Sequence, residues 1–338
     1  MSFEIRRGTN ISHWLSQSDR RGRERQAWFT REDVRQIAGL GLDHLRLPID
    51  EEQMWNEAGG REPEAWDLMN ACLDWCGQEG LRAVVDLHIL RSHYFNARTT
   101  PRLFTDPAES LKFAALWRDL SAALRTRPID RVAYELMNEP VAPDAKDWNR
   151  VYRHPYRAIR ELEPGRIVVL GSNLWSQART FDALDVPEND PNLILTFHYY
   201  NPMFVTHYRA SWVTECKAYA GPVRYPGTPL TPEDFRRAQA DMPGLTDDWN
   251  KPYDAAVMEA DLAKPLAVAA RTRLPLYCGE FGVLNTVPPA SRIAWYRDFA
   301  SVLNKHRIAW ANWDYKGGFG LFDGDGKPTA ALDGLLAP

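Results

Sequence analysis

Two glutamates carry the strongest chemical signal in this sequence. Glu139 lies in the run VAYELMNEP, and Glu280 lies in the run LPLYCGEFG. Each follows a short apolar run of the kind that forms a buried strand. Two carboxyl groups can cleave a glycosidic bond when one protonates the leaving oxygen and the other attacks the anomeric carbon. An exposed loop charge is the alternative for either glutamate alone, but finding both in such runs favours catalysis.

Other polar residues recur at the ends of apolar runs. Burying such groups without a partner is costly, so core packing alone does not explain them. Barrel enzymes place their reacting groups at the C-terminal ends of the strands. The sequence therefore predicts one shared site. Its members are Asn10, His13, Arg46, His88, Asn138, Asn173, His198, Tyr200 and Trp313.

Eight apolar runs alternate with helical patterns along the whole chain, and several of them, such as AVVDL and IVVLG, are continuously apolar. Continuous apolar runs are typical of parallel strands that are covered on both faces. The alternation predicts an α/β protein with a single (β/α)8 TIM-barrel domain over residues 1–338. An open doubly wound sheet is the alternative, but no GxGxxG follows the first strand. The predicted strands are 7–11, 44–49, 82–88, 131–137, 167–171, 193–198, 276–279 and 308–313.

The intervening segments have helical periodicity. The connecting segment 201–248 is long and rich in Pro, Gly, Tyr and Trp. Long connections of this kind are usually functional or disordered, and the aromatic content argues against disorder. We therefore predict a long loop insertion there. The predicted helices are 32–38, 66–78, 109–125, 149–162, 254–271 and 291–306.

Composition excludes several classes of function. The net charge is −4, so no general basic field attracts nucleic acid, and no apolar stretch approaches the length of a membrane span. The start, MSFEIRRGTN, has no apolar core of a secretory signal, which fits a cytoplasmic protein or a secreted one whose signal was removed. The four cysteines form no CxxC pair. We expect no metal, no cofactor and a monomer.

Seven short segments, which span nearly the whole chain, form a recognisable set: RGTNISHWL, LRLP, DLH, LMNEP, FHYYNP, CGEFG and WANWDYKGGFG. Their most specific feature is the order of NEP, then H-x-Y, then GEFG, then a Trp. Together they resemble glycoside hydrolase family 5, the cellulase family of retaining β-glycosidases in clan A.

The resemblance implies a role for each central residue. Glu139 would be the acid/base and Glu280 the nucleophile. Asn138 would hydrogen-bond the sugar 2-hydroxyl, and Arg46 would pair with Glu280 and keep it ionised, as a nearby cation does. Tyr200 would donate a hydrogen bond to Glu280.

Other residues would line the site. His88 and His198 would lie beside the reacting sugar, and Trp313 would form the floor beneath it, because apolar sugar faces pack on aromatic rings. A hydrogen-bonded structural histidine is the alternative for both histidines. We assign Trp310 to packing. Secondary candidates for sugar contact are Asn10, Trp14, His93, Asn96, Trp175, Trp212 and Lys316.

The resulting hypothesis is a retaining endo-β-1,4-glucanase acting on a β-linked oligo- or polysaccharide. Alternatives are an exo-acting β-glucosidase or β-mannosidase, and a mannanase or xyloglucanase acting on oligosaccharides. A non-catalytic carbohydrate-binding barrel is an alternative from another class. A phosphate-binding isomerase has only KGGFG at 316–320 in its favour. The segment GLFDGDGKP, with Asp323 and Asp325, lacks the register of a calcium loop and predicts a polar turn.

Overall fold

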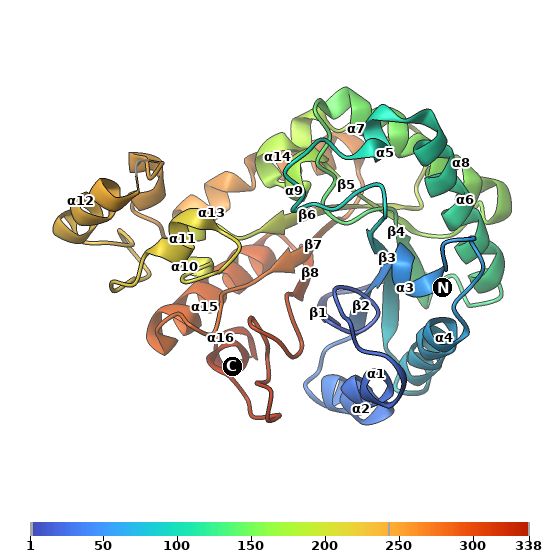
Figure 1. The fold of residues 1–338 in the computed structure, drawn as a ribbon, viewed down its shortest axis with the longest axis horizontal. Helices are drawn as coiled ribbons and strands as arrows, with labels where there is room; N and C mark the ends of the chain where they lie inside the picture. Colours follow the sequence, from blue (N-terminus) through green and yellow to red (C-terminus); the bar gives the residue numbers. More distant parts are fainter. Residues whose placement is uncertain (1–2, 243, 337–338) are drawn as a thin grey trace. The chain divides into compact units, whose positions relative to one another are not determined.

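A computed structural model describes residues 3–242 and 244–336. Eight parallel strands follow one another in chain order and close into a barrel (Figure 1). The predicted TIM-barrel fold is therefore confirmed. The strands are β1 (Arg7–Asn10), β2 (His44–Asp50), β3 (Arg82–Ile89), β4 (Val132–Glu135), β5 (Val168–Gly171), β6 (Leu193–Tyr199), β7 (Leu276–Phe281) and β8 (Ala309–Asn312).

The chain groups into two compact units, which we describe separately. The first comprises residues 3–198, 264–279 and 309–311 and contains almost all of the barrel strands. The second comprises residues 199–242, 244–263, 280–308 and 312–336. Strand β7 extends two residues beyond its predicted end, so Glu280 lies within the strand rather than after it.

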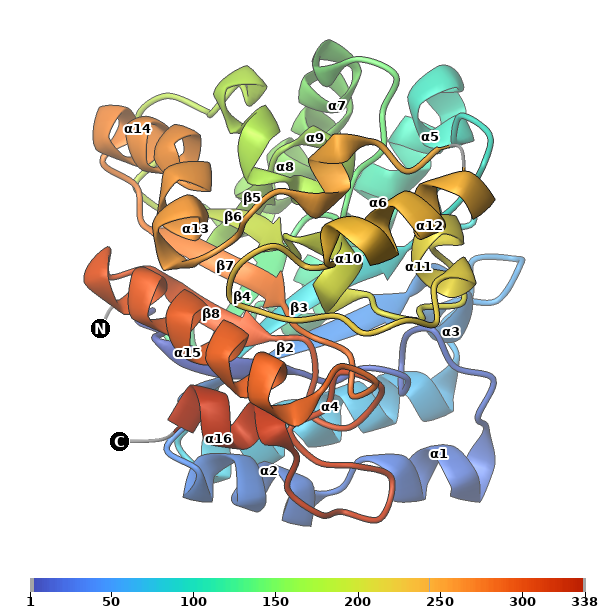
Figure 2. The same ribbon diagram turned by 90° about the vertical axis from the view of Figure 1, so that its left-hand side faces the viewer.

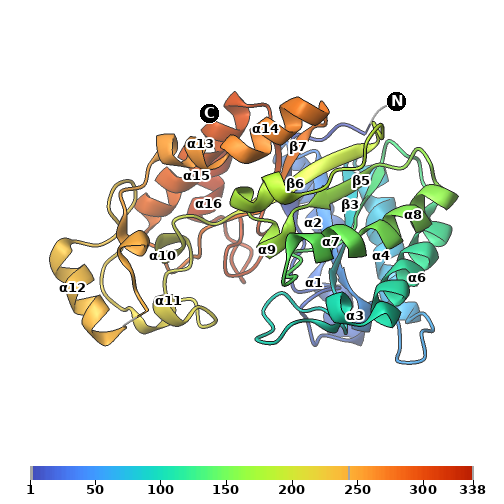
Figure 3. The ribbon, with the colours of Figure 1, turned by 90° about the horizontal axis from the view of Figure 1, so that it is seen from above.

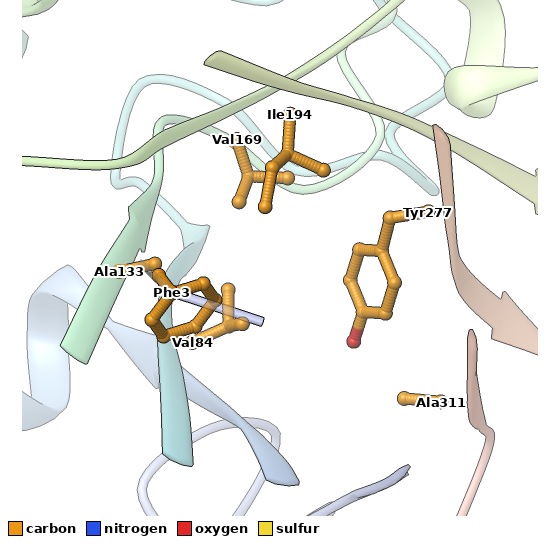
Figure 4. Close-up of a cluster of buried hydrophobic side chains, with 7 residues drawn as sticks. All are labelled: Phe3, Val84, Ala133, Val169, Ile194, Tyr277 and Ala311. Carbon is orange, nitrogen blue, oxygen red and sulfur yellow. The ribbon is translucent and has the colours of Figure 1, made fainter. Parts of the chain in front are cut away.

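The first unit has its core inside the barrel (Figure 4). Side chains from different strands meet there because alternate residues of each strand point inward. The Tyr277 hydroxyl also lies 3.2 Å from Nε2 of His44, which gives two buried polar groups a partner. The cluster consists of Phe3, Val84, Ala133, Val169, Ile194, Tyr277 and Ala311.

Helices cover the outside of these strands. Helix α6 begins with the N-cap Asp106, whose Oδ1 accepts from the backbone N–H of Ala108 at 2.9 Å, and Pro107 occupies the first helical position. Helices α6 and α8 lie side by side (Figures 1 and 3). The helices are α1 (Gly22–Trp28), α2 (Arg31–Gly39), α3 (Glu51–Met54), α4 (Pro63–Gln78), α5 (Arg102–Thr105), α6 (Pro107–Leu124), α7 (Ala145–Val151), α8 (Arg153–Leu162), α9 (Asn173–Ser176), η1 (Ala178–Ala183) and α14 (Ala263–Thr272).

Two predicted helices are each split into two. The segment 149–162 contains the end of α7 and all of α8, and the segment 254–271 contains α13 (Ala255–Asp261) and most of α14. Pro155 and Pro265 explain the breaks. Proline has no N–H and clashes with the carbonyl four residues earlier, so it is tolerated only in the first turn of a helix. The prediction of single helices was therefore wrong at both places.

The second unit contains the predicted insertion, 201–248, which is not a bare loop. It folds into α10 (Met203–Thr206), α11 (Thr214–Ala218), α12 (Pro232–Asp241) and the start of η2 (Asp247–Asn250). The unit also contains α15 (Pro289–Lys305) and α16 (Ala330–Leu336), which pack against each other (Figure 2). Among the described residues, no helix is both long enough and apolar enough to cross a bilayer.

Candidate active site

Arg46 is the centre of the polar cluster in the first unit. It lies on β2 and its side chain is fully buried. Its Nε donates to Glu135 Oε2 at 2.7 Å, and its Nη2 donates to Glu135 Oε1 at 2.9 Å. Its Nη2 also lies 3.0 Å from Asp86 Oδ2. These charge-assisted hydrogen bonds offset the free-energy cost of burying the Arg46 guanidinium.

The two carboxyl groups beside Arg46 have raised pKa values. Burial raises the pKa of Asp86 to about 7, against the opposing effect of Arg46. The pKa of Glu135 is also raised to about 7. Burial is the largest cause, the charge of Asp86 adds to it, and Arg46 opposes both. One guanidinium cannot fully neutralise two carboxylates. Our sequence analysis missed Asp86 and Glu135, although an acid inside an otherwise apolar strand was a visible signal.

Arg46 also fixes two asparagines. Its Nη2 donates to Asn138 Oδ1 at 2.9 Å, and its Nη1 donates to Asn10 Oδ1 at 3.0 Å. Asn10 Nδ2 in turn donates to the carbonyl of Gly279 at 2.9 Å, and its side chain is fully buried. Asn10 therefore supports Arg46 rather than facing a sugar. Asn138 Nδ2 is buried and has no hydrogen-bond partner among the described residues, so it can donate to a ligand.

Glu139 follows Asn138 with its backbone in the left-handed region, at φ 44°. Such strain in a residue other than glycine is concentrated at functional sites. Its side chain is nearly buried, and its Oε1 lies 2.9 Å from Nδ1 of His198 on β6. Burial lowers the pKa of His198 well below its ordinary value, and Arg46 and His88 lower it further. His198 is therefore neutral near pH 7, and depending on its tautomer its Nδ1 can accept a hydrogen bond from protonated Glu139 or donate one to ionised Glu139.

Two of the other predicted histidines, His88 and His93, are also buried, whereas His13 is half-buried. His88 places Nδ1 2.7 Å from Asp86 Oδ2, which ties it to the Arg46 cluster. His93 Nε2 accepts from the backbone N–H of Val141 at 3.2 Å, and burial lowers its pKa to about 3. His93 is 1% exposed and lies against the segment after Glu139, and its Nδ1 is buried without a hydrogen-bond partner among the described residues.

The predicted tryptophans of this unit differ in exposure. Trp175 is half-buried, and its Nε1 donates to the carbonyl of Phe95 at 2.9 Å. Trp14 is fully buried and donates to the carbonyl of Arg25 at 2.8 Å, so it cannot serve as a sugar platform. Trp310 is buried, as predicted. Asn96 is exposed and donates to the Tyr94 hydroxyl at 3.4 Å.

In the second unit, Glu280 is the central acid. Its side chain is nearly buried, and its Oε2 accepts from the hydroxyl of Tyr200 at 2.9 Å, as the resemblance implied. Edge-on ring contacts with His207 and Phe319 position Tyr200. A hydrogen bond donated to a carboxylate favours its ionised form. The Tyr200 hydroxyl therefore favours the carboxylate form of Glu280.

The two predicted tryptophans of this unit differ in exposure. Trp212 in the insertion is 56% exposed and contacts Phe319, whereas Trp313 is buried, at 8%. Lys316 lies above the ring of Tyr315, which is itself buried. Trp212 therefore offers an exposed aromatic face of the kind on which sugars pack.

The segment predicted as a polar turn has that structure. The Asp323 side chain accepts hydrogen bonds from the backbone N–H groups of Asp325 and Lys327, both at 2.9 Å. A carboxylate bonded to the backbone in this way closes a turn without a ligand.

The chain's family follows from a comparison with known proteins. Residues 9–318 match the model of the cellulase family, glycosyl hydrolase family 5. The chain belongs to glycoside hydrolase family 5. The resemblance inferred from the motifs is thus confirmed, and the chain is a cellulase-like glycoside hydrolase. Neither a non-catalytic barrel nor a phosphate-binding isomerase fits this assignment.

The relatives of this family 5 chain named here align with 90% or more of its length. Endoglucanase C of Acetivibrio thermocellus is 31% identical over 328 residues, which cover 96% of this chain and 95% of that protein. Cellodextrinase A of Ruminococcus flavefaciens is 29% identical over 90% of this chain and 84% of that protein. The structure of Thermotoga maritima Cel5A with a mannotriose substrate has the same fold, with a TM-score of 0.77, 23% identity and coverage of 98% and 97%.

Proposed function

We propose that the chain is a retaining endo-β-1,4-glucanase in which Glu280 is the nucleophile and Glu139 the acid/base. The proposal is carried by the different surroundings of the two carboxyl groups. Glu280 accepts a hydrogen bond from Tyr200, whereas Glu139 lies against the neutral imidazole of His198. Two carboxyl groups in different environments can divide the roles of acid and nucleophile.

The reaction has two steps. A carboxylate oxygen of Glu280 attacks the anomeric carbon while the bond to the leaving oxygen breaks and Glu139 gives that oxygen its proton. This step leaves a covalent glycosyl ester on Glu280. Glu139, now ionised, then takes a proton from water, whose oxygen attacks the anomeric carbon and releases Glu280. Two inversions restore the original β configuration, and the mechanism requires the two carboxyl groups to lie about 5–5.5 Å apart.

The remaining residues of the site support these steps. Asn138 Nδ2, buried and without a protein partner among the described residues, would donate to the sugar 2-hydroxyl. A bond at that position strengthens as positive charge develops on the sugar ring. Arg46 fixes the other end of the Asn138 amide by donating to its Oδ1 at 2.9 Å. Trp313 would form the floor of the reacting subsite.

A glucan substrate and internal cleavage are proposed from the relatives. Endoglucanase C covers nearly the whole chain and shares 31% of its residues. The similarity to Cellodextrinase A favours a second candidate, an exo-acting glucosidase or an enzyme for short oligosaccharides. Mannan and xyloglucan are less supported, because the mannotriose-bound relative is only 23% identical.

An aryl β-cellobioside assay tests the assignment of the nucleophile. Glu280→Gln should lose at least a thousand-fold in kcat, because the amide cannot capture the glycosyl unit, whereas Glu57→Gln, at an exposed loop position, should match the wild type. Proton NMR of the first product should show the β anomer. Equal rates for Glu280→Gln and the wild type, or an α product, would remove Glu280 from the mechanism.

A product profile separates the two substrate candidates. Wild-type enzyme is incubated with cello-, manno- and xylo-oligosaccharides of increasing length. Endo-glucanase action predicts internal cleavage of cello-oligosaccharides into mixed products. Release of a single terminal sugar or disaccharide from every length would instead support the exo-acting candidate.

A further inference from the structure

Segment 140–142, which directly follows Glu139 in the first unit, is held by loops on both sides. Strand β4 pairs with β3 and with β5. The loop after β3 contributes His93, and the segment after β5 contributes Asn173 and Trp175. Each of these residues hydrogen-bonds a backbone group of segment 140–142. We call this set of contacts the 140–142 clamp.

Asn173 makes the shortest contacts of the clamp. Its Oδ1 accepts from the backbone N–H of Ala142 at 2.8 Å, and its Nδ2 donates to the carbonyl of Ala142 at 3.0 Å. The residue is 5% exposed. Because the amide bonds both polar backbone groups of one residue, it holds Ala142 as a paired strand would.

Two longer contacts complete the clamp. On the β3 side, His93 Nε2 accepts from the backbone N–H of Val141 at 3.2 Å. On the β5 side, the backbone N–H of Trp175 donates to the carbonyl of Pro140 at 3.3 Å. Segment 140–142 is therefore bonded to both neighbouring loops, so it cannot shift toward one without breaking its bonds to the other.

The turn that carries Asn173 has an unusual backbone. Its next three residues all have positive φ: Leu174 at 55°, Trp175 at 61° and Ser176 at 52°. Residues other than glycine rarely adopt this region, and such strain persists only where the surrounding structure determines it. The hydroxyl of Thr180 supports the turn by donating to the carbonyl of Asn173 at 2.7 Å. This turn directs the Asn173 amide and the Trp175 N–H at the same segment.

Glu139 is the residue whose conformation depends on the clamp. Its φ of 44° is also left-handed, and its Oε1 lies 2.9 Å from Nδ1 of His198. An unrestrained chain would relax toward negative φ, which would move the side chain. The chain is fixed before Glu139, where the N–H of Asn138 donates to the carbonyl of Leu87 at 3.2 Å. The clamp fixes it after Glu139, so the strained φ cannot relax.

We propose that Asn173 is a positioning residue for the acid/base, which holds the Glu139 carboxyl group at the leaving oxygen by fixing the backbone of Ala142. This inference rests on the proposed function and names a residue outside the catalytic pair on which proton transfer depends. A displacement of about 1 Å at a reacting group can cost about 100-fold in rate. Only the proton donor is displaced, so the loss should follow the need of the leaving group for a proton.

Two aryl β-cellobiosides separate a displaced acid from a general loss of structure. The 2,4-dinitrophenolate group leaves without a proton, whereas the phenolate group needs one from the acid. Asn173→Ala should lower kcat/KM roughly 30-fold on the phenyl substrate and at most about three-fold on the dinitrophenyl substrate. Glu139→Gln, which has no acid at all, should show the same selectivity with a larger loss on the phenyl substrate.

Asn149→Ala is the matched control. Asn149 Nδ2 donates to the carbonyl of Ala183 at 2.9 Å, and its Oδ1 accepts from the backbone N–H of Asp185 at 3.1 Å. This variant therefore loses the same kinds of backbone bond outside the clamp, and its kcat/KM should match the wild type on both substrates. Asn173→Asp keeps the acceptor for Ala142 N–H but loses the donor to the Ala142 carbonyl. It should show the selectivity of Asn173→Ala, and it decides the matter if circular dichroism shows Asn173→Ala to be unfolded.

The outcomes separate this proposal from the proposed function. If Glu139→Gln shows the selectivity but folded Asn173→Ala and Asn173→Asp lose equally on both substrates, or on neither, Asn173 does not position the acid and the glycosidase assignment stands. If Glu139→Gln itself loses equally on both substrates, the acid/base assignment fails, and the role of Asn173 fails with it.

Discussion

Glu135→Gln should stabilise the protein at alkaline pH, although it removes one partner of a buried arginine. Glu135 is fully buried and shares Arg46 with Asp86. Because burial and Asp86 outweigh Arg46, the pKa of Glu135 rises from 4.5 to about 7 in the folded protein. The neutral amide has nearly the shape of the protonated acid, so the variant mimics the form that the folded state prefers.

The magnitude follows from proton linkage. Between the unfolded and folded pKa values, the folded state binds more protons than the unfolded state, so stability falls as pH rises. Each pH unit in this window costs about 1.4 kcal/mol. The pKa of Glu135 is 4.5 in the unfolded chain and about 7 in the folded protein. Its ionisation therefore lowers the free energy of unfolding of the wild type by at most about 3 kcal/mol between pH 4.5 and pH 7.5. Glu135→Gln has no ionisable group at this position, so its stability does not fall in this way.

Urea unfolding at pH 5 and pH 8 measures the effect. The free energy of unfolding of Glu135→Gln relative to the wild type should rise by about 2–3 kcal/mol from the lower to the higher pH. Glu163→Gln is the matched control, because Glu163 is also buried but has Arg166 as its own partner and accepts from Tyr134 at 2.9 Å and Ser121 at 2.6 Å. That variant should destabilise the protein at both pH values, since breaking a buried pair costs about 3–5 kcal/mol. If Glu135→Gln instead becomes less stable relative to the wild type as pH rises, Arg46 outweighs burial and the reasoning is refuted.

Two further predictions follow from single contacts. Tyr200→Phe should lower kcat on an aryl β-glycoside roughly 100-fold, because Glu280 loses the hydroxyl that donates to it at 2.9 Å. The melting temperature should change little. A change confined to KM would contradict this role of Tyr200. Asp323→Ala should lower the melting temperature by about 2–4 °C, because the Asp323 carboxylate closes the turn through two backbone N–H groups. EDTA should leave the wild-type melting temperature unchanged, and a clear drop would show that the turn holds a cation.

The barrel could be predicted from sequence because parallel strands covered on both faces are continuously apolar. Strand positions were predicted to within a few residues, and the strand-end polar residues were found by reading along each run. The helix breaks were also visible, since Pro155 and Pro265 stand in the sequence. Helix α12 was missed because it buries only Ala238 and so has no apolar stripe, although Thr231 and Pro232 form an N-terminal signal.

The charge network could not be predicted, because its partners are distant in the chain. Arg46 and Glu135 are 89 residues apart, and Asn10 and Gly279 are 269 apart. Strand periodicity shows that a residue lies on a strand, but not which neighbour its side chain meets once the barrel closes. The sequence therefore identified Arg46 as a site residue while giving no role to Glu135.

Asn10 and Asn138 show what such a network adds to the sequence signal. Both are asparagines near strand ends, and both give their side-chain oxygen to Arg46. Asn10 also uses its amide N–H to bond Gly279, so it has little left to offer a ligand. Asn138 keeps a buried amide donor without a protein partner among the described residues. Because Arg46 fixes the amide orientation, that donor is held in place before any ligand binds. The unused hydrogen-bond donor, rather than the residue type, is therefore what separates the proposed substrate contact, Asn138, from the structural support, Asn10.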